Sequence, residues 1–327
     1  MADFDLPLDQ LRGYTPPVNE PGDFDAFWQK TLAAAAERPV LIERQPVTTG
    51  LRLLRTWSVT FAGFGGDPVQ AWFSRPAGVD PGVRLPAVVE FAGYGRGRGL
   101  PHERLTWPVA GYAHLLMDNR GQDGLYGTGS DTPDPGHRGL GGPGPVTRGI
   151  LAPEDYYYRR LITDAARAVD AVRALPGVDP DRVVVAGNSQ GGGLALAAAG
   201  LVPGLAALIV SAPFLCHIER ALRLTDLEPY GAVSHFLSLH RDAEEAVRRT
   251  LSYMDGLHFA RRATAPAHFG VGLRDTVCPP STAFAAYNHY GSEDRVIHAY
   301  PFNGHEGGEA FHTARQLQWL TTRLPPE

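Results

Sequence analysis

The sequence contains almost no lysine. Lys30 is the single lysine in 327 residues, and it lies near the beginning of the chain. A phosphate-binding P-loop, a Schiff-base enzyme and a Ser-x-x-Lys site each need a lysine in the folded centre of the chain. The composition therefore excludes these three classes of enzyme.

Clusters of basic residues and long apolar runs are absent as well. The net charge is −5 and the basic residues are scattered singly, so nothing resembles an electrostatic footprint for nucleic acid or an anionic membrane. No apolar run could span a bilayer, and the first residues, MADFDLPLDQLRGYTPP, have neither the basic nor the apolar region of a signal peptide. We therefore expect no nucleic-acid partner, no membrane association and a cytoplasmic location.

Cysteine is also scarce, with Cys216 and Cys278 the two examples. Neither belongs to a C-x-x-C motif or to a Cys/His spacing that binds metal. We interpret both as buried, reduced thiols.

The N-terminal part of the chain predicts a helix followed by antiparallel strands. Residues 23–36 place apolar side chains at helical spacing behind Asp23, which we expect to cap the helix. The runs 40–47, 51–63 and 69–75 alternate in polarity, as strands of a half-buried sheet do. Residues 1–75 therefore form an extension that enters a sheet.

From residue 85 onward, short apolar strands alternate with amphipathic helices. This alternation is typical of a mostly parallel, doubly wound α/β sheet with helices on both faces. We find no repeat and no low-complexity linker, so we expect a single domain over 1–327. The predicted strands are 85–93, 113–119, 181–187, 205–213, 268–275 and 295–302, and the predicted helices 156–177, 194–201, 281–289 and 308–323.

Two segments interrupt this alternation. Residues 121–150 are rich in Gly and Pro and predict a long ordered loop or a mobile lid. Residues 214–262 predict two or three helices inserted between adjacent strands. Insertions beyond the carboxyl edge of such a sheet usually shape the substrate pocket.

Residues 187–191, Gly-Asn-Ser-Gln-Gly, match the G-x-S-x-G motif. The motif is short, but here it follows an apolar strand and opens a helix, as a nucleophile elbow does. Gly192 and Gly193 follow, although each glycine costs a helix about 1 kcal/mol relative to alanine, which indicates close packing under the turn. The alternative is a tight strand-to-helix turn that contains Ser189 by coincidence.

A serine nucleophile needs a base and an orienting carboxylate, which follow it in this order: serine, acid, histidine. Asp275 ends one predicted strand and His305 lies in the loop after the last strand. His298 falls inside a strand and His312 inside a helix, which are poor places for a mobile base. For Asp275 the alternative is a residue that only forms a turn.

Acyl transfer also needs two N–H donors for the developing oxyanion. We assign one to the backbone of Gln190, directly after the nucleophile. We assign the other to Tyr94, in the glycine-rich turn that follows the strand at 85–93. Its ring would line the acyl pocket, or else pack on the surface as an ordinary loop aromatic.

The chain resembles carbohydrate esterase family 7, which contains acetyl xylan esterases and cephalosporin C deacetylases. The similar blocks are LRGYTPP, DFDAFWQKTL, AGYG (92–95), Arg120-Gly121-Gln122, YYYRRLITDAARAVDA, GNSQGGGLALAAA, PFLCHIERAL, residues 250–290 and Gly304-His305-Glu306. They extend from residue 11 to residue 306. One departure is the segment 123–126, Asp-Gly-Leu-Tyr, where the family usually continues with a short Gly/Ser segment.

The resemblance implies an α/β-hydrolase fold, a Ser189, Asp275, His305 triad, and an oxyanion hole formed by Tyr94 and Gln190. It also implies a serine esterase that removes acetyl groups from small acetylated substrates, such as acetylated xylo-oligosaccharides, cephalosporins and aryl acetates. No metal and no organic cofactor are implied, and the expected assembly is a homohexamer. We interpret Arg120 as a structural ion-pairing residue and Glu306 as positioning the histidine loop.

Two alternatives to an esterase remain open from the sequence. A peptidase of the prolyl oligopeptidase type would need a pair of carboxylates to hold a substrate amine. Glu244 and Glu245 are adjacent, but they fall in a helix that we expect to be solvated. The other alternative is a non-catalytic binding protein that keeps the hydrolase fold.

Overall fold

The chain is built around one nine-stranded sheet in the order β1-β2-β3-β5-β4-β6-β7-β8-β9. The computed structural model describes residues 4–122, 124–136 and 144–326. The strands are β1 Leu41–Val47, β2 Leu54–Ala62, β3 Pro68–Pro76, β4 Leu85–Phe91, β5 Ala113–Met117, β6 Val178–Asn188, β7 Ala207–Ser211, β8 Ala267–Gly272 and β9 Arg295–Tyr300. The predicted α/β architecture is confirmed, with a sheet that is mostly parallel.

The antiparallel entry to the sheet is also confirmed. Strands β1, β2 and β3 pair antiparallel, and β3 continues antiparallel onto β5. From β5 through β4 and β6 to β9, every neighbouring pair is parallel. The carboxyl ends of β4, β6, β8 and β9 therefore meet at one edge of the sheet.

Helix α2, Phe24–Ala36, begins where the sequence indicates, but the predicted side-chain cap is wrong. Asp23 occupies the N-cap position without a capping hydrogen bond from its carboxylate. Its Oδ1 instead accepts a hydrogen bond from Tyr253 Oη at 2.5 Å. This tertiary contact ties the start of α2 to the helical insertion, and Trp28 strengthens the tie by donating from Nε1 to the Tyr253 carbonyl at 3.0 Å.

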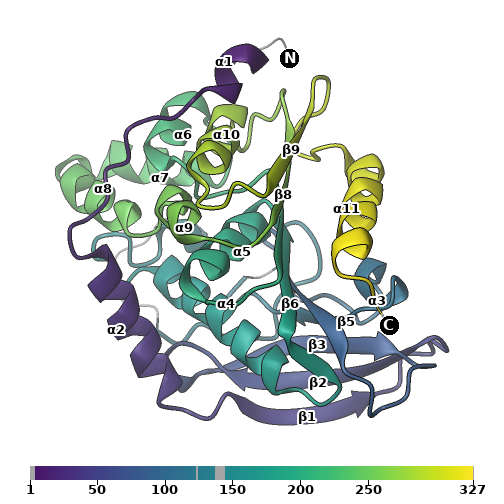
Figure 1. Cartoon of the computed structure of the whole chain (residues 1–327). Coiled ribbons are helices and arrows are strands. Elements are labelled where there is room, and N and C mark those ends of the chain that lie inside the picture. Colours follow the sequence, from purple (N-terminus) through teal and green to yellow (C-terminus); the bar gives the residue numbers. More distant parts are fainter. Residues whose placement is uncertain (1–3, 123, 137–143, 327) are drawn as a thin grey trace.

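Helices cover both faces of the sheet (Figure 1). One face carries α4, Tyr157–Ala174, and α5, Gln190–Leu201. The opposite face carries α3, Thr106–Val109, and the C-terminal helix α11, Glu309–Arg323. Among the described residues, the other helices outside the insertion at 214–262 are α1 Leu8–Arg12 and α10 Pro280–His289, and a short 3₁₀ turn η1 lies at Phe64–Gly66.

The insertion at 214–262 contains four α-helices, one more than the upper limit predicted. They are α6 Ile218–Leu224, α7 Tyr230–Leu239, α8 Glu244–Ser252 and α9 Gly256–Arg262, with a 3₁₀ turn η3 at Arg241–Ala243. Short breaks at 225–229 and 253–255 separate helices that are each only two or three turns long. Such short helices leave little periodicity for the sequence to reveal.

The Gly/Pro-rich segment 121–150 is only partly described, because residues 123 and 137–143 lie outside the described residues. The prediction of a long loop or lid is therefore not tested there. Its described part is hydrogen-bonded to the body of the fold. Thr132 Oγ1 donates to the buried Asp118 at 2.8 Å, and Arg160 donates through two nitrogens to Asp134 at 2.7 Å. A 3₁₀ turn, η2 Pro145–Thr147, closes the segment.

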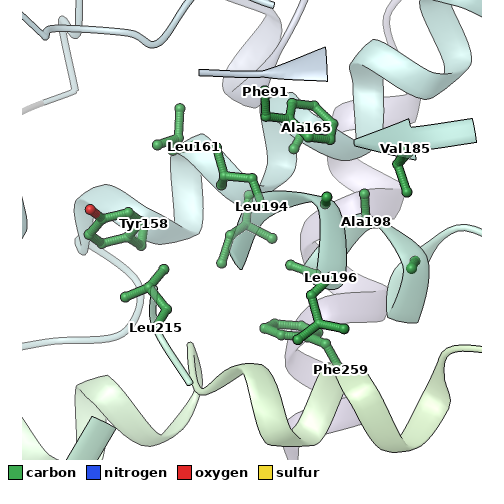
Figure 2. Packing of buried hydrophobic residues seen from close by; sticks show 14 of the residues in the cluster. Phe91, Tyr158, Leu161, Ala165, Val185, Leu194, Leu196, Ala198, Leu215 and Phe259 are labelled. Carbon is green, nitrogen blue, oxygen red and sulfur yellow. The ribbon is translucent and has the colours of Figure 1, made fainter. Parts of the chain in front are cut away.

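The main core lies between the sheet and the α4–α5 layer. Residues 190–199 of α5 are all buried, which explains why that helix is apolar on every side. Figure 2 shows Leu194 facing Leu161 of α4, with Leu196 against Phe259 of α9. Among the described residues, no helix combines the length and apolar character needed to cross a membrane.

Candidate active site

Ser189 occupies the strained turn between β6 and α5. Its backbone has φ 59° and ψ −124°, a conformation that residues with a Cβ rarely adopt. The turn is held by its own backbone: Ser189 N donates to Ser211 O at 3.0 Å, and Ser189 O accepts from Gly193 N and Phe214 N at 3.0 Å each. The elbow geometry expected from the motif is therefore present.

The glycines around Ser189 are required by close backbone contacts. A Cβ on Gly187 would overlap the Gly191 carbonyl group, and a Cβ on Gly191 would overlap the Phe91 carbonyl oxygen at the end of β4. A Cβ on Gly193 would overlap the Phe214 carbonyl oxygen. Helix α5 thus passes so close to β4 and to the segment after β7 that no larger residue fits.

His305 joins Ser189 to Asp275 in one chain of hydrogen bonds. His305 Nε2 lies 2.9 Å from Ser189 Oγ, and His305 Nδ1 lies 2.8 Å from Asp275 Oδ2. Asp275 is fully buried and Ser189 is 9% exposed, whereas the His305 side chain is 29% exposed. The three predicted side chains therefore converge, and the imidazole is the one that reaches toward solvent.

Asp275 serves its own loop and the histidine at the same time. Its Oδ1 accepts from the backbone N–H groups of Val277 and Cys278 at 2.9 and 2.8 Å, which is a turn-forming role. Its Oδ2 remains for His305. The two interpretations that the sequence left open are compatible, because each uses a different oxygen.

The acid loop and the histidine loop are also joined through the backbone. Arg274 N donates to Asn303 O at 2.9 Å, and a Cβ on Gly272 would overlap the carbonyl oxygens of Asn303 and Gly304. Glu306 accepts a hydrogen bond from Asn303 Nδ2 at 2.9 Å. Burial opposes ionisation of Glu306, but hydrogen bonds from Asn303 and from the Gly304 and Glu306 backbones outweigh it and lower its pKa.

Tyr94 and Gln190 lie at the ends of neighbouring strands. Strands β4 and β6 are parallel, with Phe91 opposite Gly187, so the segment after β4 runs beside the elbow. Gln190 is the first residue of α5, where helix geometry leaves the N–H without an intrahelical partner. The Tyr94 ring is buried, with 8% of the residue exposed, so it is not a surface aromatic. Burial raises the pKa of Tyr94 above its ordinary value.

Arg120 is fully buried and forms an ion-pair cluster, as the sequence predicts. It donates to both oxygens of Asp164 at 2.5 and 2.8 Å, and to Asp67 Oδ2 at 3.0 Å. Burial disfavours the charged guanidinium, but Asp164 outweighs it and raises the Arg120 pKa. The cluster anchors the segment after β5 to α4 and to the turn before β3.

Sequence reasoning missed several polar side chains around the elbow. Three consecutive buried tyrosines at the start of α4 each donate to a different segment: Tyr156 to Val146 O, Tyr157 to Arg120 O and Tyr158 to Gln190 Oε1. Gln122 Nε2 also donates to Gln190 Oε1, at 2.8 Å. The Tyr-Tyr-Tyr run and the Arg-Gly-Gln motif could have indicated these residues, but neither pattern predicts which residues they contact.

The rejected candidates lie away from the Ser189 hydroxyl. His298 is in β9 and His312 in α11, and both rings contact His268 of β8 in tilted arrangements on the α11 face of the sheet. Glu244 and Glu245 are both exposed at the start of α8. Within the described part of the chain, no group of three or more His, Cys, Asp or Glu side chains could hold a metal ion.

A mostly parallel sheet with a serine elbow, and with an acid and a histidine after later strands, defines the α/β-hydrolase class. Comparison with known proteins is more specific. The family model "Acetyl xylan esterase (AXE1)" matches residues 1–323, and the chain belongs to that family. It is a serine acetyl esterase, and thus a carboxylic ester hydrolase; the resemblance stated from the sequence is confirmed.

Individual relatives agree with the family. The acetyl xylan esterase from Paenibacillus sp. R4 is 37% identical, with a TM-score of 0.91 over 98% of this chain and 100% of that chain. The acetyl xylan esterase 1 from Thermoanaerobacterium sp. JW/SL YS485 is 32% identical, with a TM-score of 0.86 over 96% and 99%. Acetyl esterase Axe7A of Xylanibacter ruminicola is 27% identical over 96% of this chain and 69% of its own length.

Peptidases share the fold at a greater distance. A prolyl endopeptidase structure has a TM-score of 0.59 at 17% identity, over 84% of this chain and 39% of that chain. This similarity concerns the fold alone. The family match does not favour the peptidase or the non-catalytic alternative.

Proposed function

We propose that Ser189, His305 and Asp275 are the catalytic triad of this acetyl esterase. Ser189 Oγ attacks the acetyl carbonyl while His305 Nε2 takes its proton, and Asp275 holds the imidazole and stabilises its charged form. The imidazolium then protonates the departing alcohol, and water repeats the sequence on the acetyl-enzyme. The continuous contact from Asp275 through His305 to Ser189 Oγ, at 2.8 and 2.9 Å, is the observation that carries the proposal.

The oxyanion would be bound by the backbone N–H groups of Tyr94 and Gln190. The parallel register of β4 and β6 supports this role, because it brings the two segments side by side at the carboxyl edge. Gln190 also contributes the N-terminal end of α5, where the helix dipole favours negative charge.

Replacing the nucleophile tests the triad directly. Ser189→Ala should lower kcat on an aryl acetate by about 10⁴-fold or more without unfolding the protein. Ser238→Ala is the matched control, because Ser238 is an exposed serine whose hydroxyl donates to His235 O. A fluorophosphonate should covalently label the wild type and Ser238→Ala but not Ser189→Ala. More than a tenth of the wild-type activity in Ser189→Ala would end the assignment.

We further propose small acetylated molecules as substrates: acetylated xylo-oligosaccharides, cephalosporins and aryl acetates. The names of the two similar solved esterases support the xylan-derived class. The buried Tyr94 ring supports a short acyl group, because a methylene that clashes costs about 1 to 3 kcal/mol in kcat/KM. Faster cleavage of butyrate than of acetate esters would contradict this preference.

A panel of substrates separates the esterase from a peptidase on the same fold. Acetylated sugars, a cephalosporin and aryl acetates should be turned over, whereas aminoacyl arylamides should not. The exposed Glu244 and Glu245 support this expectation, because they lie on the solvent face of α8 and Glu244 is paired with Arg248 at 2.9 Å.

The assembly, location and domain organisation remain proposals. We propose a cytoplasmic homohexamer whose subunits each form one domain over 1–327, with no bound cofactor. The single sheet that runs from β1 to β9 supports the one-domain interpretation. Light scattering coupled to size-exclusion chromatography tests the hexamer, and a mass equal to one chain of 35.3 kDa would refute it.

A further inference from the structure

Gln122 lies buried between the two segments that would supply the oxyanion donors. It is 1% exposed and belongs to the segment after β5, which contributes neither donor. Its Oε1 accepts from the Gly95 backbone N–H at 2.6 Å, one residue after Tyr94. Its Nε2 donates to Gln190 Oε1 at 2.8 Å and to Tyr157 Oη at 2.9 Å.

The partners determine which way the amide of Gln122 points. A backbone N–H can only donate, so the oxygen of Gln122 must face Gly95. The NH₂ group then faces Gln190, whose own oxygen also accepts from Tyr158 Oη at 2.9 Å. Only a side chain with both a donor and an acceptor at this length can make the Gly95 and the Gln190 contact together.

Asn119 provides a comparison for the link that Gln122 makes between the loop after β4 and α5. Asn119 holds the same loop by donating from Nδ2 to the carbonyls of Ala92, Gly93 and Arg96 at 3.2, 3.2 and 2.9 Å. Asn119 thus fixes the loop after β4 to the segment after β5. Of Asn119 and Gln122, Gln122 is the one that also contacts the elbow, by its hydrogen bond to the Gln190 side chain.

Distances between the donors matter because an oxyanion hole acts through geometry. Each N–H must lie about 2.7–3.1 Å from the oxyanion, and removing one donor costs about 10²–10³ in kcat. Tyr94 and Gln190 are 96 positions apart in the sequence and sit on different elements. Something must set their separation to a fraction of an ångström.

We propose that Gln122 is a positioning residue that sets the spacing between the Tyr94 and Gln190 backbone N–H groups. It does not touch the substrate; it acts by joining the loop after β4 to the first turn of α5. The inference rests on the proposed function, because it presumes that these two N–H groups bind the oxyanion.

Two substitutions test the link. Gln122→Met keeps the length of the side chain and removes all three hydrogen bonds, to Gly95, Gln190 and Tyr157. Gln122→Glu keeps an acceptor for Gly95, but its ionised carboxylate has no proton to donate to Gln190 or to Tyr157. Burial raises the pKa of a carboxyl group, so this variant is assayed up to about pH 9. Each should lower kcat on an aryl acetate by about 10- to 100-fold while KM changes by less than about threefold. A loss of folded enzyme would also lower the apparent kcat at constant KM, so kcat is calculated for the concentration of folded protein, determined by circular dichroism.

Tyr290→Phe is the matched control for losing one buried hydrogen bond. Tyr290 is 3% exposed and donates to Ala265 O at 2.8 Å, between α10 and the start of β8. We expect its kcat to stay within about threefold of wild type. Hydrogen exchange adds a local readout: the amides at 92–97 should exchange faster in Gln122→Met, whereas those of β6 should not.

The outcomes distinguish this inference from the proposed function. If the wild-type enzyme fails to cleave acetate esters or to react with a fluorophosphonate, the proposed function is wrong. If the wild type is active and both folded Gln122 variants keep kcat within about threefold, the positioning role is overturned. Should Gln122→Met not fold, Gln122→Glu decides alone, since it retains the Gly95 contact.

Discussion

Three histidine rings in contact on the α11 face of the sheet predict that acid destabilises the protein. His268 of β8 is 1% exposed and its ring centroid lies 4.8 Å from that of His298 and 5.1 Å from that of His312. Neither ring nitrogen of His268 has a hydrogen-bond partner among the described residues. Burial, reinforced by the charges of His312, His298 and Arg315, lowers the pKa of His268 to about 3.

The direction of the effect follows from where the proton binds. The unfolded chain takes up a proton on this histidine near its ordinary pKa of about 6.5, whereas the folded chain does not until about pH 3. The free energy of unfolding therefore falls as the pH drops from about 6.5 toward 3. At about 1.4 kcal/mol per pH unit, the loss between pH 7 and pH 5 is about 2 kcal/mol for this one side chain.

Other titratable groups change the total loss of unfolding free energy, but they do so equally in the wild type and in a variant that lacks His268. Burial also lowers the pKa of His312, to about 4, so the wild-type loss exceeds that of His268 alone. Glu90 contributes little in this window: burial opposes its ionisation, but Arg104 and His114 hold its pKa at about 2, and its stabilisation is lost only below about pH 4.5.

Urea unfolding at pH 7 and pH 5 measures the loss. His268→Leu removes the proton site and leaves no polar group unpaired, so its loss should be about 2 kcal/mol smaller than that of the wild type. His102→Gln, at an exposed position, is the control and should match the wild type. If His268→Leu loses as much stability as the wild type between the two pH values, the reasoning is refuted.

Two further predictions concern buried contacts. Asp164→Asn leaves the fully buried Arg120 short of its main counter-ion and should lower the free energy of unfolding by about 3–5 kcal/mol, measured by denaturant titration; a loss under 1 kcal/mol would show that Asp67 and Asp134 suffice. Gly193→Ala forces a Cβ against the Phe214 carbonyl and should cost about 1–3 kcal/mol despite the better helix propensity of alanine. A Gly193→Ala protein with a raised Tm would contradict the close packing.

Local patterns located most of the elements and the candidates for the triad, because strand ends and the glycines around Ser189 are visible in short stretches of sequence. Alternation and periodicity located the strands and the long helices, and the position of Asp275 and His305 after strands followed from strand ends alone. The predicted cap of Asp23 was wrong for the opposite reason. Its partner, Tyr253, lies 230 positions away, and no local pattern reveals a contact that only the folded chain creates.

The polar residues behind the elbow were also missed because their contacts are long-range in sequence. Gln122 and Gln190 are 68 positions apart, and their amide–amide bond exists only because β5, β4 and β6 are neighbours in that order. The sequence indicated a parallel sheet but not that β5 lies outside β4. Strand order is decided by packing over the whole domain, so the network that depends on it stayed hidden.

The strand order also explains why the proposed site needs so few special residues. With β4 beside β6, and β8 beside β9, each half of the site consists of two parallel strands ending together. One half brings the Tyr94 segment against Ser189; the other brings Asp275 against the His305 loop. Strand β7 separates the halves, and its Ser211 carbonyl accepts the Ser189 N–H at 3.0 Å, so the elbow is held from the middle. Ser189 keeps its strained backbone conformation because β4 and β7, on either side of β6, hold the turn through the Gly191–Phe91 contact and the Ser189–Ser211 hydrogen bond.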